Sequence, residues 1–186
     1  MSDDRRRRFE EAYLDAYERI LGYATRRCDS PEDALDVVAE TFEVAWRRID
    51  DLPPGDQARL WLYGVARNVL ANQRRGNLRR HAGQAELRED IADLYARTAP
   101  PAERADLKAV GRVFRALSDD DRELLSLVAW EGLDAGEIAR VLGCSRNAAR
   151  IRIHRARRRL SRALAVADVE TPLMSRPTRI PTGGSL

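Results

Sequence analysis

Residues 133–164, LDAGEIARVLGCSRNAARIRIHRARRRLSRAL, predict two helices joined by a tight turn. Asp134 is a good N-cap for the first helix, and Glu137 three residues later completes a capping box. Gly143 supplies the left-handed residue that ends a helix before a sharp turn, and Ser145 is placed to cap the second helix. These signals together predict a helix-turn-helix.

The second predicted helix has one apolar stripe and one basic face. Its apolar residues recur at steps of three or four, the spacing of a single helix face. They are Ala149, Ile153, Ala156, Leu160 and Leu164. Arginines fill the positions between them, and no acidic residue occurs in residues 138–167. A solvated helix that balanced its own charge would alternate signs, so this face is interpreted as a surface for a polyanion.

In a helix-turn-helix the second helix lies in the DNA major groove, with its first residues at the base edges. Arg146, Asn147 and Arg150 follow Ser145 in that first part of the helix. Arginine and asparagine have the bidentate geometry that suits guanine and adenine edges. The arginines of residues 155–159 suit phosphate contacts, which add affinity without sequence information.

Composition limits the alternatives. The chain has 186 residues, enough for one domain or two small ones, with 34% charged and 6% aromatic residues and a formal net charge of +3. Its cysteines, Cys28 and Cys144, and its histidines, His81 and His154, are isolated in the sequence. We therefore expect no metal, no cofactor, no disulfide framework and no catalytic nucleophile–base pair. Without an apolar leader or span, the expected location is the cytoplasm.

The rest of the chain predicts an all-α protein. Apolar residues recur at helical spacing in residues 9–27, 31–48, 59–75, 106–117 and 119–130, with Ser30 and Ser118 as caps and residues 49–58 as a loop. We expect two small helical domains joined by a flexible linker. The expected boundaries are residues 1–77 and 105–165 for the domains, 78–104 for the linker and 166–186 for a disordered tail.

Two of these predicted helices have a polar face, and their composition alone does not decide the role of that face. The helix at 31–48 has an acidic face, which is either simply solvated or a docking surface for a basic partner. The helix at 59–75 mixes aromatics, amides and arginines outside its apolar stripe, with Trp61 and Tyr63 among them. That mixture suits unstacked bases and phosphates, and it equally suits core aromatics beside a basic helix end.

Three stretches resemble one family. DALDVVAETF at residues 33–42 resembles the segment DAEDLVQETF, and WLYGVARNVLANQRR at residues 61–75 is similar to a WLYRIARNLALDYLRR-like helix. Residues 133–160 are similar to LSYEEIAEILGISVGTVKSRLHRARRRL. These segments, in this order, belong to the bacterial sigma-70 family of transcription initiation factors, in its two-domain extracytoplasmic-function group. The resemblance covers roughly residues 9–164.

The resemblance implies three sets of site residues. Those that would bind core RNA polymerase are Asp36, Glu40, Thr41 and Phe42. Those that would contact the promoter −10 element are Trp61, Arg67, Asn68, Asn72, Arg74 and Arg75, with Asn72 replacing a usual aspartate. Those that would contact the −35 element are Ser145, Arg146, Asn147, Arg150, Arg152, Arg155 and Arg158, with Asn147 and Ala148 replacing a usual Gly-Thr.

The function expected from the residues and the resemblance together is that of a sigma factor. Such a protein binds the clamp and flap regions of RNA polymerase core and directs initiation at specific promoter DNA, and the family commonly has an anti-sigma factor as a regulator. A stand-alone helix-turn-helix repressor that acts without polymerase is the alternative. An enzyme is a distant third, because no catalytic constellation is visible.

Overall fold

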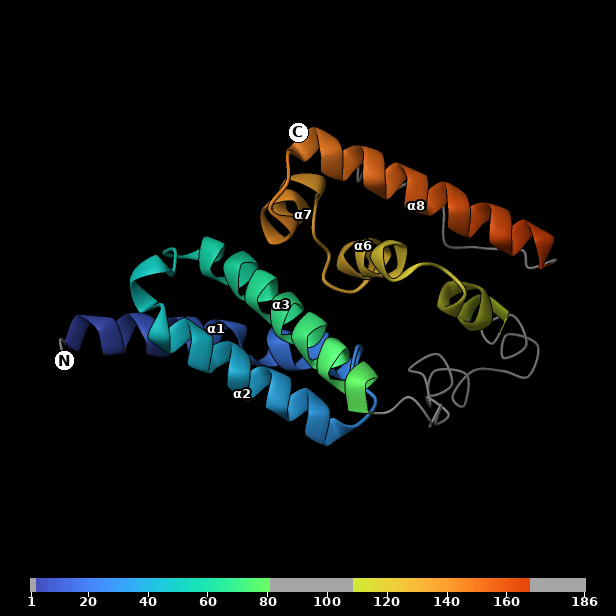
Figure 1. Ribbon diagram of the computed structural model, residues 1–186. Helices are drawn as coiled ribbons and strands as arrows, with labels where there is room; N and C mark the ends of the chain where they lie inside the picture. The colour runs from blue at the N-terminus through green and yellow to red at the C-terminus, as the bar shows by residue number, and fades with distance from the viewer. Residues whose placement is uncertain (1–2, 81–108, 168–186) are drawn as a thin grey trace, which may run out of the picture.

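The computed structural model describes residues 3–80 and 109–167, and every regular element within them is helical (Figure 1), which confirms the all-α prediction. Residues 109–115 form a helix without a label in Figure 1. The labelled elements are α1 (Asp3–Thr25), α2 (Pro31–Arg47), the short 3-10 helix η1 (Ile49–Asp51), α3 (Asp56–Arg80), α6 (Asp119–Ala129), α7 (Ala135–Leu142) and α8 (Arg146–Val166).

The helix caps lie where the sequence predicts them. The side chains of Ser30, Ser118 and Ser145 each accept a hydrogen bond from the backbone N–H three residues on, at 3.0, 3.3 and 3.2 Å. Asp134 forms the complete capping box at the start of α7, and Gly143 ends that helix with a φ of 63°. Only glycine adopts this left-handed conformation without strain, which is why the turn into α8 is so short.

The expected loop at residues 49–58 is more ordered than its prolines and glycine suggest. It contains η1, and α3 begins inside it, at Asp56 rather than near residue 59. Ile49, Leu52 and Ala58 are buried there in a small apolar cluster of their own. Arg8 of α1 donates a hydrogen bond to the Leu52 carbonyl at 2.8 Å. Contacts with α1 therefore order this segment, and those contacts are distant in sequence.

Helices α1, α2 and α3 pack pairwise into what we call the N-terminal bundle. Residues 109–115 with α6, α7 and α8 form the C-terminal bundle, in which α8 packs on both α6 and α7. The apolar stripe predicted for α8 is buried in its core at Ala149, Ile153, Ala156 and Leu164, and Leu160 is half-buried. Helices α7 and α8 of the C-terminal bundle are thus the helix-turn-helix that the sequence predicts.

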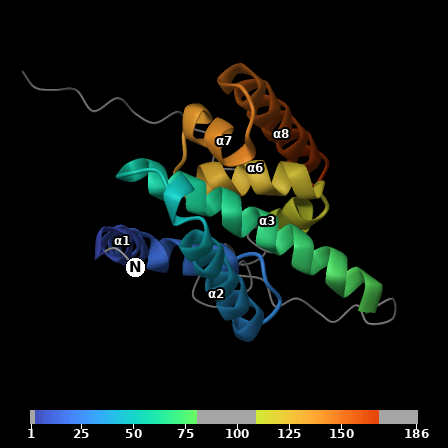
Figure 2. The same ribbon diagram turned by 60° about the vertical axis from the view of Figure 1, so that its left-hand side comes forward.

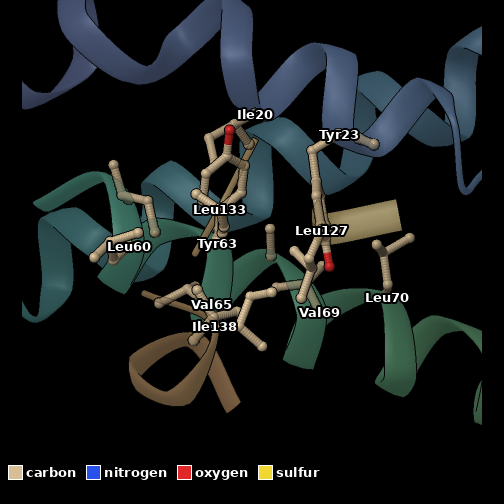
Figure 3. Close-up of a cluster of buried hydrophobic side chains, with 14 of the residues drawn as sticks. Ile20, Tyr23, Leu60, Tyr63, Val65, Val69, Leu70, Leu127, Leu133 and Ile138 are labelled. Carbon is tan, nitrogen blue, oxygen red and sulfur yellow. The ribbon is translucent and has the colours of Figure 1, made fainter. Parts of the chain in front are cut away.

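The two bundles share one continuous apolar core. Figures 1 and 2 show α3 lying between α1 and α2 on one side and the C-terminal bundle on the other. Figure 3 shows side chains of α1, α3, α6 and α7 gathered in the same cluster, including Ile20, Tyr63, Leu127 and Ile138. A helix that is apolar on two faces must be covered on both. Tyr63, expected outside the apolar stripe, is 2% exposed because it lies on this second face.

The expected linker and tail lie largely outside the described residues. Residues 78–80, placed in the linker by the sequence, belong to the last turn of α3. Residues 81–104 are not described. Helix α8 ends at Val166, one residue into the expected tail, and residues 168–186 are not described.

Candidate nucleic-acid interface

Helix α8 presents a basic face to solvent. All seven residues expected to contact the −35 element are exposed. They are Ser145, Arg146, Asn147, Arg150, Arg152, Arg155 and Arg158. Burial of the alanine and isoleucine stripe on the opposite side turns these side chains outward. The face combines short polar groups in its first turn with arginines along its length, the order in which a helix meets base edges and then phosphates.

Helix α7, on which the start of α8 rests, is itself held by a cap at its first turn. The Asp134 carboxylate accepts backbone hydrogen bonds from Glu137 at 2.8 Å and Gly136 at 2.6 Å. These two bonds lower the pKa of Asp134, and the nearby Arg146 and Arg140 lower it further. The carboxylate is therefore ionised at neutral pH and holds the first turn of α7 in place. Helix α7 in turn supports the start of α8.

One arginine of α8 has a structural partner. Arg159, which the sequence grouped with the phosphate-contacting arginines, places Nη1 at 2.7 and 3.0 Å from the two carboxylate oxygens of Asp121. Asp121 is 6% exposed, in the first turn of α6. A buried carboxylate needs such a partner. Arg159 thus ties α8 to α6, whereas its neighbour Arg158 has no acidic partner among the described residues.

A hollow of about 510 Å³ lies beside the basic face, between α6, α7 and α8. Asn147, Arg150 and Arg155 line it, together with the exposed Ile151. Polar donors thus surround an apolar side chain at the part of α8 that would lie nearest the bases. Such a set can donate hydrogen bonds to base edges and contact a thymine methyl group.

The residues expected to contact the −10 element are less uniformly exposed. Asn68, Asn72, Arg74 and Arg75 are exposed along the second half of α3. Arg75 donates a hydrogen bond to the Asn72 side chain at 2.5 Å, and the charged ends of Arg74 and Asp119 are 3.9 Å apart. These exposed amides and guanidinium groups can meet bases and phosphates.

Trp61 and Arg67, the other two residues of this set, are half-buried. Trp61 packs on the small cluster formed by Ile49, Leu52 and Ala58. The Arg48 guanidinium lies 5.6 Å from the centre of its ring, a cation–π arrangement. Arg48 was not predicted, since only the fold of the loop brings it to Trp61. The indole is therefore held in a fixed position with part of its surface free.

A second hollow, of about 730 Å³, lies between α3, α6 and α8. It brings Arg67 of α3 together with Arg152 and Arg155 of α8, although the resemblance assigns them to different promoter elements. Acidic side chains of α6 share its wall. They are Asp120, Asp121 and Glu123. Opposite charges therefore face each other across the junction of the two bundles.

The four residues expected to bind polymerase core divide into two kinds. Asp36 is exposed on α2 and Glu40 is half-buried beside it. Thr41 is fully buried and its hydroxyl donates to the Val37 carbonyl at 2.6 Å. Phe42 is 6% exposed, with its ring centre 4.7 Å from that of Tyr13. Thr41 and Phe42 thus lie on the buried side of α2, where Phe42 packs on aromatic rings of α1.

Sequence reasoning missed a cluster of charges at the junction of the bundles. Arg26 and Arg27 at the end of α1 meet Glu123 and Glu131, which are about a hundred residues further along the chain. Nothing local marks these four residues, because arginines after a helix and acids on an amphipathic helix are ordinary surface features. Only their pairing in the structure shows that these residues connect the two bundles.

The described residues contain no group of three or more histidine, cysteine or acidic side chains suited to hold a metal ion. Within the same part of the chain, no helix has both the length and the apolar character needed to cross a membrane.

Comparison with known proteins gives the family. Residues 12–92 match the model of sigma-70 region 2, and residues 107–160 match that of sigma-70 region 4. The RNA polymerase sigma factor CnrH of Cupriavidus metallidurans is 35% identical over 159 residues, covering 81% of this chain and 83% of its own. The extracytoplasmic-function (ECF) sigma factor EcfG of Rhodopseudomonas palustris is 31% identical, covering 84% and 85%.

A solved structure of CnrH, in complex with the cytosolic domain of CnrY, matches the fold as well. Its TM-score is 0.57 at 27% identity, with 85% of this chain and 88% of that chain covered. The N-terminal bundle thus corresponds to region 2 and the C-terminal bundle to region 4. The chain belongs to the sigma-70 family of RNA polymerase sigma factors, in its extracytoplasmic-function group.

Proposed function

We propose that this protein binds RNA polymerase core in the cytoplasm and directs it to promoters, with α8 reading the −35 element and α3 contacting the −10 element. The observation that carries the proposal is the exposed basic face of α8 on a complete helix-turn-helix. Within the described residues, none of the five arginines expected to contact the −35 element forms an ion pair, although Arg146 lies near Asp134 and two others share a hollow with acidic side chains of α6. The charge is therefore available to phosphates, and Arg146, Asn147 and Arg150 are available to bases.

The exposed part of α3 suits a different form of DNA. Asn68, Asn72, Arg74 and Arg75 form a row of amides and guanidinium groups, and Trp61 stands at the start of the same helix. Amides and a fixed aromatic ring recognise unpaired bases by hydrogen bonds and stacking, and those contacts offset the cost of unpairing. We assign this face to the unpaired strand of the −10 element.

The acidic face of α2 is proposed as the surface that binds polymerase core. Asp36 and Glu40 form its centre, and within the part of the chain that the structure describes Glu43 pairs only with its neighbour Arg47, at 3.1 Å. Such a face is complementary to a basic partner and steers its approach. Since CnrH forms a complex with the cytosolic domain of CnrY, we also propose an anti-sigma factor as a partner of this chain. The proposed role includes no catalytic step of its own.

The test is transcription in vitro with purified core polymerase and fragmented genomic DNA of the source organism, with and without this protein. Discrete transcripts that require both proteins are expected. Arg150→Ala should weaken discrimination among −35 sequences more than core binding, and Glu40→Lys should weaken core binding more than DNA contacts. Absence of transcripts, together with tight binding to a palindromic site without polymerase, would establish a repressor instead.

A further inference from the structure

The hollow of about 730 Å³ between α3, α6 and α8 has the size of a ligand site. Sites for small molecules usually enclose about 300–1,000 Å³. Side chains from helices far apart in the sequence form its wall, with Arg67 on α3, Asp120 on α6 and Arg152 on α8 among them. Asn147 and Arg150, at the end of α8 that would meet the bases, line the other hollow instead.

Two acidic side chains on the wall of this hollow already have partners in the protein. Asp121 pairs with Arg159 at 2.7 and 3.0 Å. Glu123 accepts a hydrogen bond from Arg27 Nε at 2.7 Å and another from the Tyr23 hydroxyl at 2.7 Å. Their negative charge is therefore largely neutralised by arginines that the chain itself supplies.

Three further arginines on the wall have no such partner. They are Arg67, Arg152 and Arg155. Within the residues that the structure describes, none of them forms an ion pair, and neither does Asp120, the remaining carboxylate of the wall. The hollow thus has an excess of positive charge supplied by two different helices. Cations around one concave site focus a positive potential into it and attract anions.

Arg67 is the arginine for which an anion is most favourable. It is half-buried on α3, whereas the other two arginines are exposed on α8. Burial raises the pKa of Tyr23, and the charge of Arg67 is among those that lower it. The Arg67 guanidinium therefore lies near Tyr23, on the side of α3 that faces α6. A half-buried charge without a partner is poorly solvated, so an anion that binds there relieves an existing cost.

Phosphate is the anion that this set of donors recognises best. Each guanidinium group presents paired N–H donors in a plane, a geometry that matches two phosphate oxygens. A DNA strand spaces its phosphates along a line, whereas a polyphosphate carries its charges on adjacent groups. Three arginines gathered in one hollow are better matched to the second arrangement. The charge pattern thus favours a small polyphosphate over the backbone of DNA.

The rest of the wall suits an organic group attached to that polyphosphate. Leu117, Leu124 and Leu142 line the hollow, from the segment before α6, from α6 and from α7. Asp120 adds a carboxylate that can accept hydrogen bonds from hydroxyl groups. Ligand sites typically combine apolar walls with a few polar groups in this way. A nucleotide has the matching parts, namely a flat base, ribose hydroxyls and phosphates.

We propose that the hollow between α3, α6 and α8 binds a nucleoside polyphosphate, with Arg67, Arg152 and Arg155 on its phosphates and the three leucines against its organic part. Arg67 belongs to the set expected at the −10 element, and the other two arginines belong to the −35 set. The bound nucleotide therefore competes with DNA for residues of both sets. Only this consequence rests on the proposed function.

The first test is isothermal titration calorimetry of the free full-length protein, without magnesium and at about 0.15 M salt, where screening weakens unspecific attraction. The probes are ATP, GTP, inorganic triphosphate and adenosine. One nucleotide should bind saturably and more tightly than inorganic triphosphate, and adenosine should not bind. Equal affinity for both nucleotides and inorganic triphosphate would overturn the nucleotide assignment. Absence of binding by all three phosphate probes would overturn the site.

Variants locate the binding in this hollow. Arg67→Gln and Arg152→Gln should each raise the Kd of the nucleotide about 10- to 100-fold, the loss expected for a hydrogen bond to a charged group. Arg162→Gln is the matched control, since Arg162 is exposed on α8, outside the hollow and outside both DNA-contacting sets. It should leave the Kd unchanged. Equal losses in all three variants would show unspecific attraction and overturn the site. Circular dichroism checks that helix content is unchanged.

The second test separates the nucleotide from DNA as the source of phosphate. The nucleotide should displace a labelled −35 duplex from the protein, followed by fluorescence anisotropy. Arg67→Gln should require about tenfold more nucleotide for that displacement, although Arg67 lies on α3 and outside the −35 set. Loss of duplex affinity in both hollow variants, without nucleotide binding by the wild type, would assign these arginines to the DNA backbone and overturn the proposal. The calorimetry needs neither DNA nor polymerase, so its result stands even if no promoter-directed transcripts are found.

Discussion

Helices α3 and α8 are both long, at 25 and 21 residues, and both carry residues proposed to contact DNA, but they are buried in different ways. Helix α8 buries one narrow stripe, and among the described residues Arg159 is the only arginine of this helix that forms an ion pair. Helix α3 buries residues on two faces, one against α1 and α2 and the other against the C-terminal bundle. Helix α8 is therefore peripheral in the fold, whereas α3 is its central element.

The largest expected effect tests the central position of α3. Leu62→Ala should lower the free energy of unfolding by about 2–5 kcal/mol, because Leu62 is fully buried and its removal leaves a cavity. Leu160→Ala on α8 should cost clearly less, since Leu160 is half-buried. Urea denaturation of both variants measures the difference. Equal losses would contradict the distinction between the two helices.

Next in size is the loss of base recognition by α8. Arg150→Ala should weaken binding to the preferred −35 duplex by about 1–3 kcal/mol, roughly 10- to 100-fold, without altering thermal stability. Arg157→Ala, a control on the same helix, should weaken preferred and altered duplexes equally. Competition binding with both duplexes makes the measurement. A uniform loss for Arg150→Ala would reduce its role to a phosphate contact.

A smaller effect is expected on the exposed face of α3. Asn68→Ala should lower transcription severalfold and leave −35 duplex binding unchanged. The expected loss corresponds to one hydrogen bond, which contributes about 0.5–1.5 kcal/mol. Promoter opening can be followed by permanganate footprinting of unpaired thymines in the presence of core polymerase. If opening is unchanged, the −10 assignment of this face is wrong.

Two adjacent arginines of α8 separate structural from DNA-binding roles. Arg159→Ala should cost about 0.5–1 kcal/mol of stability, because it leaves Asp121 without its partner, although Arg159 is itself 55% exposed. Arg158→Ala should leave stability unchanged and reduce the salt dependence of DNA binding by about one unit of slope. Thermal unfolding and binding at several salt concentrations distinguish the two. The reverse pattern would exchange their roles.

The smallest effect concerns Cys28, which follows α1. Burial raises the pKa of the Cys28 thiol to about 11, and the nearby Asp33 and Asp29 contribute to the rise. Iodoacetamide should therefore react slowly at pH 8 and about tenfold faster for each pH unit up to pH 11. Because the folded pKa is raised, the neutral thiol supports folding below about pH 9, and this contribution is lost as the pH rises through about 11. Rapid reaction at pH 8 would contradict the burial of this thiol.

Much of the fold follows from local signals. The caps at Ser30, Ser118, Asp134 and Ser145 were predicted correctly because a cap depends on residues within one helical turn. The apolar stripe of α8 was predicted for the same reason, since a single helix defines its own period. The exposure of the arginines of α8 was predicted with it, because they occupy the rest of the surface of that helix.

The features that the sequence left open or predicted wrongly all concern residues whose partners are distant. The sequence left open whether Tyr63 contacts bases or belongs to the core, and it is buried because a second bundle covers it. The loop at 49–58 was expected to be irregular, yet α1 orders it. Trp61 stays a predicted DNA contact, and its half-buried position beside Arg48 and the small cluster is visible only in the fold.

The sequence by itself determined that this protein is all-helical, where most of its helices begin, and that one helix-turn-helix carries a basic face. Each of these properties depends on residues that lie close to one another in the sequence. Only the tertiary structure decided that α3 is covered on both sides and that Arg27 meets Glu123 and Glu131. Buried charges of this kind are stable only when they are paired, and no local pattern in the sequence indicates which residue about a hundred positions away will become the partner.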